Sequence, residues 1–299
     1  MSLHSLFETD KARQLFVLMR PHQYIKNVFI FCAAFFSATL FDGDSFVVSA
    51  YAFFSFCLVA SAVYVFNDLM DIDSDKCHPV KKYRPLACGK VNNREAIILF
   101  CILLSSGLVS IFFVDAQAFC LVSSYFILNV CYTVILKHYA ILDIVIISLG
   151  FVIRLFVGSV VVDIELSDWI IIMTFLLALF LALAKRRADV VHFNRTGDKA
   201  RRSLDGYNLT FVDLTMTLTA SIIIVTYIMY TITPKANAAW NNDNLYVTTL
   251  FVIIGLLRYL KLTLVENKSG SPTKLVLQDR FTQFNLLAWV FSFYWIIYA

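Results

Sequence analysis

The chain has 299 residues, of which 60% are hydrophobic and 15% are charged, and its formal net charge is +4. Soluble domains carry about a quarter of charged residues, so this composition excludes an ordinary soluble protein and indicates a membrane protein. The small positive charge does not indicate nucleic-acid binding, because membrane orientation accounts for the basic residues. We therefore expect an all-α, polytopic membrane protein.

Apolar stretches of about 20 residues, long enough to cross a hydrocarbon core of about 30 Å, recur along the chain. Helices are expected in them because a helix satisfies its own backbone polar groups in lipid. Before the first stretch, residues 1–22 form an N-terminal interfacial segment, with a short helix over 5–19 that ends near Pro21. The whole chain, 1–299, then forms one transmembrane domain. Its nine predicted transmembrane helices lie at about 23–41, 45–66, 95–114, 117–136, 140–162, 168–184, 209–232, 245–264 and 283–298.

Lysine and arginine are distributed very unevenly between the predicted loops. The loops after odd-numbered spans contain a single basic residue, Lys235, whereas the N-terminus and the loops after even-numbered spans hold nearly all the others. The positive-inside rule therefore predicts a cytoplasmic N-terminus and an external C-terminus. Two long polar loops, 67–94 and 185–208, are then cytoplasmic, and we expect them to border a central cavity that opens to the cytoplasm.

The first polar loop begins with the dense acidic stretch "NDLMDIDSD", residues 67–75. If the second span continues as a helix, Asn67, Asp71 and Asp75 are spaced four residues apart and face the same way, with Asp68 beside them. Such oxygen ligands suit Mg²⁺, which commonly bridges carboxylates to phosphates. The cations that follow, Lys81, Lys82 and Arg84, can hold phosphate oxygens. The pattern predicts a Mg²⁺–diphosphate site; the alternative is a solvated acidic helix end followed by orienting lysines.

One basic residue lies deep in a predicted span. Arg154 is about fourteen residues into the fifth span, and a buried arginine in a membrane helix is costly and often functional. It is interpreted either as a substrate ligand or as a structural partner of Asp143 or of a loop carboxylate.

The acidic stretch resembles the N-D-x-x-D-x-x-x-D motif of the UbiA superfamily of intramembrane prenyltransferases, whose members have nine transmembrane helices. In that family the motif binds Mg²⁺ and a diphosphate, and a second motif, D-x-x-x-D, follows the sixth span. This chain departs from the second motif, because it has Lys185, Arg186 and Arg187 there and Asp189 as its main carboxylate.

Further motifs resemble one branch of the superfamily, the decaprenyl-phosphate phosphoribosyltransferases. They are "RPHQYIKN" (20–27), the acidic stretch continued to "HPVKKYRP" (78–85), "YTVILKHYAILD" (132–143), "FVIR" (151–154), "KRRAD" (185–189) and "RRSLDGY" (201–207). The resemblance implies transfer of a 5-phosphoribosyl group from phosphoribosyl diphosphate (PRPP) to a polyprenyl phosphate for cell-envelope glycan precursors. It also implies the bacterial inner membrane, and the superfamily allows a homo-oligomer.

The resemblance gives each polar group an expected role. Asn67, Asp68, Asp71 and Asp75 would hold Mg²⁺ and the leaving diphosphate, and the three aspartates with Lys81 and Arg84 form the expected catalytic set. The donor's 5-phosphate would bind Lys185, Arg186, Arg201 and Ser203, with Asp189 and Tyr207 positioning the ribose or the cations. The lipid phosphate would bind Lys26, Arg84 and Lys137. Other expected substrate-binding residues are Gln23, Asn27, Tyr132, Asp143 and Arg154.

Two other functions fit parts of the pattern. A prenyltransferase acting on an aromatic or other polar acceptor would use the acidic motif, but the basic "KRRAD" stretch disfavours a prenyl diphosphate site. A transporter or channel would distribute polar groups through several spans, whereas here nearly every charge lies at a predicted cytoplasmic end.

Overall fold

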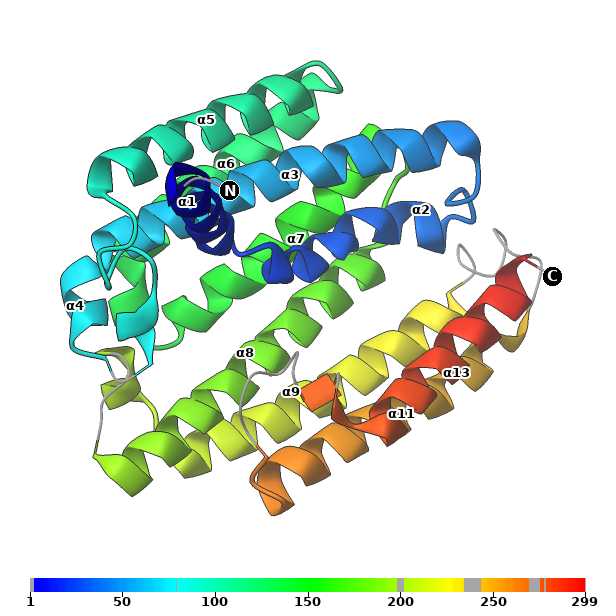
Figure 1. Ribbon diagram of the computed structural model, residues 1–299. Coiled ribbons are helices and arrows are strands. Elements are labelled where there is room, and N and C mark those ends of the chain that lie inside the picture. Colours follow the sequence, from blue (N-terminus) through cyan, green and yellow to red (C-terminus); the bar gives the residue numbers. More distant parts are fainter. Residues whose placement is uncertain are drawn as a thin grey trace. The chain divides into compact units, whose positions relative to one another are not determined.

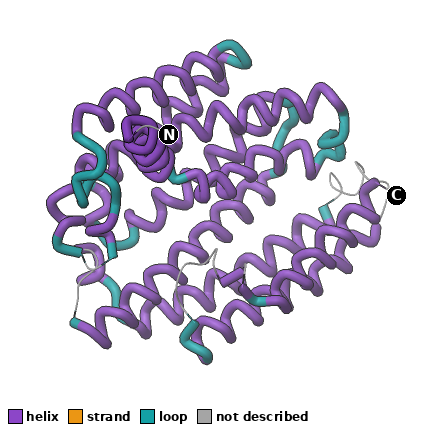
Figure 2. The backbone as a smooth tube through the Cα atoms, in the orientation of Figure 1, coloured by secondary structure: helices purple, strands orange, loops and turns teal. Residues whose placement is uncertain are grey.

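The computed structural model describes residues 3–78, 80–197, 202–233, 243–268, 275–276 and 278–298. In these ranges the regular structure is helical and contains no strand, as Figure 2 shows. The longer helices are α1 (Leu3–Met19), α3 (Gly43–Met70), α5 (Asn93–Phe112), α6 (Ala116–Val134), α7 (Leu142–Val161), α8 (Asp168–Thr196), α9 (Leu209–Ile232), α11 (Thr249–Leu260) and α13 (Arg280–Tyr298) (Figure 1). The shorter ones are η1 (Pro21–Phe31), α2 (Cys32–Phe36), α4 (Ile72–Lys76), η2 (Lys81–Tyr83), η3 (Leu136–His138), η4 (Arg202–Gly206), η5 (Asp243–Thr248) and η6 (Lys261–Val265).

Seven helical segments of the described residues are long and apolar enough to cross a membrane. They confirm a multi-span helical protein and match seven of the nine predicted spans: Gly43–Met70, Asn93–Phe112, Ala116–Val134, Leu142–Val161, Asp168–Thr196, Leu209–Ile232 and Asn244–Val265. The first predicted span, 23–41, is instead the 3₁₀ helix η1 followed by the short helix α2. The last predicted span corresponds to α13, a helix of 19 residues. A count of nine spans stays a prediction.

The chain divides into two compact units. The first contains residues 1–137 and 153–165, and the second contains residues 138–152 and 166–299. Helix α7 therefore contributes its beginning to the second unit and its end to the first.

In the first unit, α3 packs against α5, α6 and η1. Small residues allow this close packing, as is common between membrane helices. A Cβ atom added at Gly107 of α5 would lie 2.9 Å from the backbone oxygen of Ser55 in α3. One added at Gly158 of α7 would lie 1.9 Å from the backbone oxygen of Ile30 in η1. The end of α7 is thus pressed directly against the backbone of η1.

In the second unit, α8 packs against α9, and α11 packs against both α9 and α13. Phe180 of α8 stacks on Tyr259 of α11, with ring centroids 5.2 Å apart. Arg187, a buried residue of α8, donates to Asp213 of α9 at 2.7 Å and to the backbone oxygen of Thr263 at 2.6 Å. A buried arginine therefore ties together the ends of three helices in this unit.

Two membrane helices are distinctly longer than the others. Helix α3 has 28 residues and α8 has 29, whereas α5, α6, α7 and α9 have 19 to 24. At 1.5 Å per residue, the two long helices extend about 42 to 44 Å, which exceeds a hydrocarbon core of about 30 Å. The acidic motif begins at the end of α3, and the "KRRAD" stretch lies in the last part of α8.

Candidate functional site

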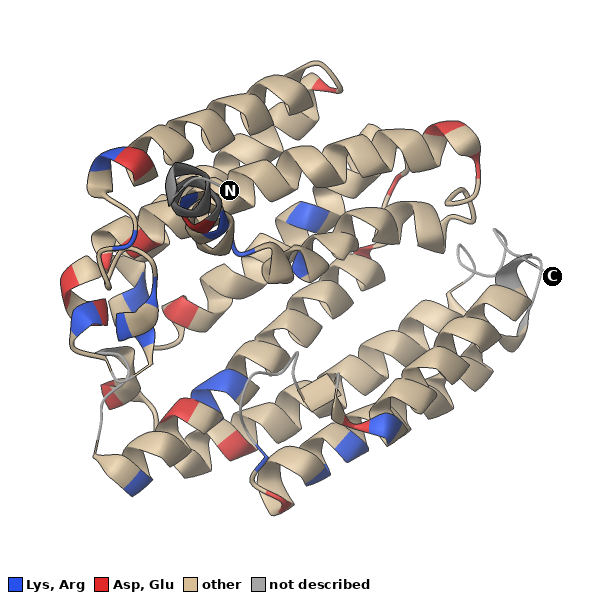
Figure 3. Cartoon of the chain, viewed as in Figure 1, with Lys and Arg blue, Asp and Glu red and all other residues tan. Residues whose placement is uncertain are grey.

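The acidic motif contains a break between two helices. Helix α3 ends at Met70, Asp71 leaves the helical conformation with φ −100° and ψ 5°, and α4 begins at Ile72. The helix therefore continues past Phe66 but is interrupted at Asp71, among closely spaced like charges, which destabilise a helix. Figure 3 shows acidic and basic residues gathered around this connection in the first unit. The break lies between Asp68, which belongs to α3, and Asp75, which belongs to α4.

Two carboxylates of the motif share one guanidinium. Arg84 Nη1 lies 2.5 Å from Asp75 Oδ2 and 3.1 Å from Asp68 Oδ1. Both aspartates are buried, each with 2% relative exposure, so this pairing takes place largely out of water. Lys81 is farther away, with its Nζ 4.0 Å from Asp75 Oδ1. The two carboxylates are thus held close enough to contact the same cation.

Arg20 adds a second cation to this pair. Its Nη2 lies 2.5 Å from Asp68 Oδ1, and its guanidinium stacks over the Tyr64 ring at 5.3 Å. The Arg20 backbone is left-handed, with φ 55° and ψ 57°, directly before Pro21. Left-handed conformations are unfavourable for a residue other than glycine and concentrate at functional sites. The site role of Arg20 was missed, although it begins the "RPHQYIKN" motif.

The other two expected metal ligands of the motif, Asn67 and Asp71, contact α6 and the residues after it. Lys137 Nζ lies 2.6 Å from Asp71 Oδ1. Thr133 donates its hydroxyl to Asn67 Oδ1 at 3.3 Å. The structure therefore brings Lys137, expected at the lipid phosphate, to the edge of the acidic motif. Thr133 lies inside the "YTVILK" stretch but had no expected role.

The donor set fits a hard divalent cation. The motif offers carboxylate and amide oxygens, which Mg²⁺ prefers, and Arg84 already places positive charge between two of them. No group of three or more His, Cys, Asp or Glu side chains among the described residues is arranged to hold a metal as they stand. Asp68 and Asp75 are therefore the pair best placed to share a metal, and Asn67 and Asp71 belong to the same motif.

Arg154 is buried inside the first unit among aromatic rings. Its guanidinium lies 4.8 Å from the Phe56 ring centroid and 4.7 Å from that of Tyr125. Its Nε donates to Asn27 Oδ1 at 2.8 Å, and its Nη2 donates to the Tyr125 hydroxyl at 3.0 Å. Asn27 also donates to Cys57 Sγ at 3.1 Å. Arg154 and Asn27, both expected to bind substrate, are thus in direct contact. The remaining residues of this group, Gln23, Lys26 and Tyr132, are half-buried.

A separate polar network lies in the second unit around Asp143, which is fully buried. Its Oδ2 accepts from Arg186 Nε at 2.8 Å and from the Ser203 hydroxyl at 3.0 Å, and its Oδ1 accepts from the Tyr207 hydroxyl at 2.7 Å. Arg186 also donates to Asp189 at 2.8 Å. Burial, followed by the hydrogen bond to Asp143, raises the pKa of Tyr207, so this hydroxyl stays protonated and donates.

This network differs from the phosphate clamp expected from the sequence. Arg186 and Ser203 are buried with 1% exposure each and are directed at Asp143, so in this structure they hold a carboxylate and not an open anion site. The Asp143 carboxylate thus contacts Arg186, Ser203 and the Tyr207 hydroxyl, all in the second unit. Lys185, by contrast, is exposed on α8. Arg201 lies outside the described residues.

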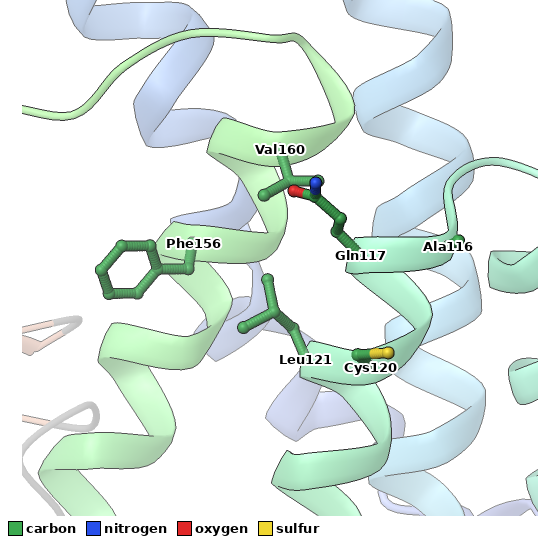
Figure 4. A pocket seen from close by; sticks show the side chains of 6 residues that line it. All are labelled: Ala116, Gln117, Cys120, Leu121, Phe156 and Val160. Atoms are coloured by element: carbon green, nitrogen blue, oxygen red, sulfur yellow. The ribbon is translucent and has the colours of Figure 1, made fainter.

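Two pockets lie elsewhere. A pocket of about 480 Å³ between α6 and α7 is lined mainly by apolar side chains (Figure 4): Ala116, Gln117, Cys120, Leu121, Phe156 and Val160. It lies at the start of α6, whereas Thr133 and Lys137 lie at and beyond its other end. A second pocket, of about 220 Å³, lies between the end of α8 and the start of α9. Neither contains the acidic motif, and the predicted central cavity stays a prediction.

Comparison with known proteins assigns the chain to a family. The model of the UbiA prenyltransferase family matches residues 27–296. A decaprenyl-phosphate phosphoribosyltransferase of Mycolicibacterium smegmatis is 34% identical over 282 residues, which cover 91% of this chain and 88% of the relative. One of Corynebacterium glutamicum is 31% identical over 285 residues, covering 94% and 85%.

Solved structures give the same result for the fold. A UbiA homolog from Archaeoglobus fulgidus bound to DMAPP and Mg²⁺ is similar with a TM-score of 0.71, over 95% of this chain and 99% of that chain, at 16% identity. At that identity the similarity supports the fold alone. The family match, however, covers most of the sequence and both polar segments. This chain therefore belongs to the UbiA prenyltransferase family.

Proposed function

We propose that the chain is a polyprenyl-phosphate phosphoribosyltransferase, which transfers the 5-phosphoribosyl group of PRPP to a decaprenyl-like phosphate and releases diphosphate. The observation that carries the proposal is 34% identity, over 91% of the chain, to an enzyme named for this transfer. The proposed place is the bacterial inner membrane, with the N-terminus and both polar segments in the cytoplasm. The product would serve cell-envelope glycan synthesis.

The acidic motif supports the departure of diphosphate. Asp68 and Asp75, which share Arg84, would hold Mg²⁺ together with Asn67 and Asp71. When bound, Mg²⁺ supplies positive charge that stabilises the leaving diphosphate. Arg84 and Lys81 lie beside these carboxylates and can contact phosphate oxygens once an anion is present. Their role is to bind and orient the leaving group as the bond at the anomeric carbon breaks.

Lys137 is the cation that we assign to the lipid phosphate. It borders the acidic motif through Asp71 and is 18% exposed at its side chain, so an anion can reach it. The acceptor phosphate is already an anion and needs no strong general base. It needs alignment behind the anomeric carbon and screening of its charge. Lys137 can provide both.

In the second unit we assign the donor's 5-phosphate to Lys185; Arg201, also expected there, lies outside the described residues. The support is the exposed position of Lys185 on α8, directly before Arg186, which belongs to the buried Asp143 network. Arg186, Asp143 and Ser203 join the end of α8, the start of α7 and η4. We therefore assign Arg186, Ser203 and Tyr207 mainly to fixing the conformation of this segment.

The direct test is transfer by the purified protein. The protein in detergent would be incubated with PRPP labelled in the ribose, Mg²⁺ and polyprenyl phosphates of several lengths. We expect a labelled lipid with at least one acceptor. A parallel reaction would offer a labelled prenyl diphosphate and an aromatic acid. Prenyl transfer in that reaction, with no labelled lipid from PRPP, would overturn the proposal.

A further inference from the structure

The carboxylates of the acidic motif are already neutralised by the protein's own cations. Asp68 contacts Arg20 and Arg84, and Asp75 contacts Arg84 and, at longer distance, Lys81. Asp71 contacts Lys137 in the same way. Each carboxylate expected to bind metal is therefore engaged by at least one cation of the protein itself.

The charges in this cluster disfavour a metal ion on its own. Four cations surround three carboxylates, so the cluster carries a small positive charge before a metal binds. A bare divalent ion would have to displace Arg84 and leave that guanidinium beside it, and like charges at such distances repel strongly where water is scarce. A diphosphate that binds together with the metal brings enough negative charge to offset the positive charge of the metal and of the four cations.

We infer that Arg84 holds the place of the metal in the ligand-free protein, so that Mg²⁺ binds together with the diphosphate of the donor and not before it. The inference deepens the proposed function, and it requires only that the donor contains a diphosphate. On binding, Asp68 and Asp75 exchange the guanidinium for the metal, and Arg84 turns to the phosphate oxygens.

The backbone around the three residues suits this exchange. Asp68 lies in α3 and Asp75 in α4, so both carboxylates are attached to helices. Arg84 follows the short η2 helix in an extended conformation, with φ −62° and ψ 146°, and its side chain is 24% exposed. The cation can therefore reorient while the two carboxylates stay in place. Without the guanidinium, two buried carboxylates would repel each other in the ligand-free protein.

The exchange has a thermodynamic consequence. If metal and diphosphate must bind together, each raises the affinity for the other by the same factor. Removing Arg84 should separate the two events, because the carboxylates then lack their resident cation. The Arg84→Gln protein should bind a divalent cation alone more tightly than the wild type and should bind diphosphate more weakly.

The experiment uses two probes that do not depend on turnover. Mn²⁺ binding to the full-length protein, without any phosphate, would be measured by electron paramagnetic resonance. Retention of labelled inorganic diphosphate would be measured by equilibrium dialysis with and without Mg²⁺. For the wild type we expect weak Mn²⁺ binding and at least tenfold tighter diphosphate binding when Mg²⁺ is present. For Arg84→Gln we expect Mn²⁺ affinity to rise about tenfold. We also expect Mg²⁺ to increase the affinity for diphosphate by a smaller factor than in the wild type.

The chain offers a matched control two residues away. Lys82→Gln removes the same charge from the same loop, but Lys82 is exposed and lies over the Tyr83 ring. We expect it to leave Mn²⁺ affinity unchanged. Arg84→Lys keeps the charge but loses the planar guanidinium whose Nη1 contacts both carboxylates, so it should give an intermediate Mn²⁺ affinity. It replaces Arg84→Gln if that variant does not fold.

Two results would overturn the inference: tight Mn²⁺ binding by the wild type without phosphate, or unchanged Mn²⁺ affinity on replacement of Arg84 by Gln or Lys. Either result with normal transfer from PRPP would leave the proposed function intact. Coupled binding of Mg²⁺ and diphosphate without transfer from PRPP would instead support the inference and contradict the proposed function.

Discussion

Arg186 and Asp143, 43 residues apart in the sequence, form an ion pair that is almost completely shielded from water. The Nε–Oδ2 distance is 2.8 Å, and the side chains are 1% and 0% exposed. The pair joins α8 to the start of α7 within the second unit, and Ser203 and Tyr207 complete the coordination of the carboxylate. Such a pair is costly to break, because removal of one partner leaves the other charge buried.

Replacement of Asp143 by Leu should therefore destabilise the protein by about 3 to 5 kcal/mol. Combining it with Arg186→Met should recover much of the loss, because apolar residues can replace a buried pair. Denaturant unfolding in detergent would measure both changes. Asp73→Asn is the control, since the Asp73 side chain is 97% exposed and its loss should have little effect. A double variant no more stable than Asp143→Leu would contradict this account.

Tyr207→Phe should cost about 1.5 to 3 kcal/mol, because it removes a hydrogen bond to a buried carboxylate and the acceptor of the Ile141 N–H while keeping the ring. The pH dependence should change as well. The folded protein raises the pKa of Tyr207 above the ordinary value of 10.0, so its contribution to stability is complete below pH 10 and is lost as the pH rises further. Unfolding measured between pH 8 and pH 11 should therefore show a smaller alkaline loss in Tyr207→Phe than in the wild type. Equal alkaline losses of stability in the two proteins would show that Tyr207 does not cause the loss.

Gly158→Ala should destabilise the first unit by about 3 kcal/mol, because overpacking against a rigid neighbour forces the backbone to move. The added methyl group would lie 1.9 Å from the Ile30 backbone oxygen, too close for any side-chain adjustment to relieve. Gly43→Ala is the matched control, since no other atom lies within 4 Å of its added Cβ. Thermal unfolding in detergent would compare the two variants. Similar melting temperatures would show that α7 and η1 are less closely packed.

Lys137→Gln should raise the KM for polyprenyl phosphate by about 10- to 100-fold, which corresponds to the loss of a charge-assisted contact worth about 1.5 to 3 kcal/mol. The KM for PRPP should change less, because Asp68 and Asp75 keep their contacts with Arg84. Initial rates with each substrate varied in turn would separate the two effects. Lys90→Gln, at an exposed position, is the control. A larger change in the KM for PRPP would assign Lys137 to the donor.

The sequence was sufficient to predict the helical membrane architecture, because long apolar runs have few alternatives in lipid. It did not indicate the helix type of the first predicted span. Residues 21–31 include several polar side chains and begin after the strained backbone of Arg20, and the structure has a 3₁₀ helix there. The length of an apolar run does not distinguish a 3₁₀ helix from an α-helix.

The acidic motif was recognisable from its residue types, but its contacts were not. Helical spacing placed Asn67, Asp71 and Asp75 on one face, whereas in the structure Asp68 and Asp75 share Arg84, and Asp71 contacts Lys137. Local repulsion between carboxylates made such a break foreseeable, but not its position. The partners of Asp143 could not be predicted, because nothing in a single sequence indicates which distant cation meets a given acid.

The lengths of α3 and α8 relate the site to the thickness of the membrane. In each of these helices the end opposite the polar motif is separated from it by a fixed number of helical turns, so this distance is set by the helix and not by a loop. A thicker bilayer would draw the ends of α3 and α8 into the hydrocarbon, or force the helices to become more upright. Turnover in vesicles should therefore depend on acyl-chain length, with an optimum where the headgroup of the lipid substrate lies level with the carboxylates.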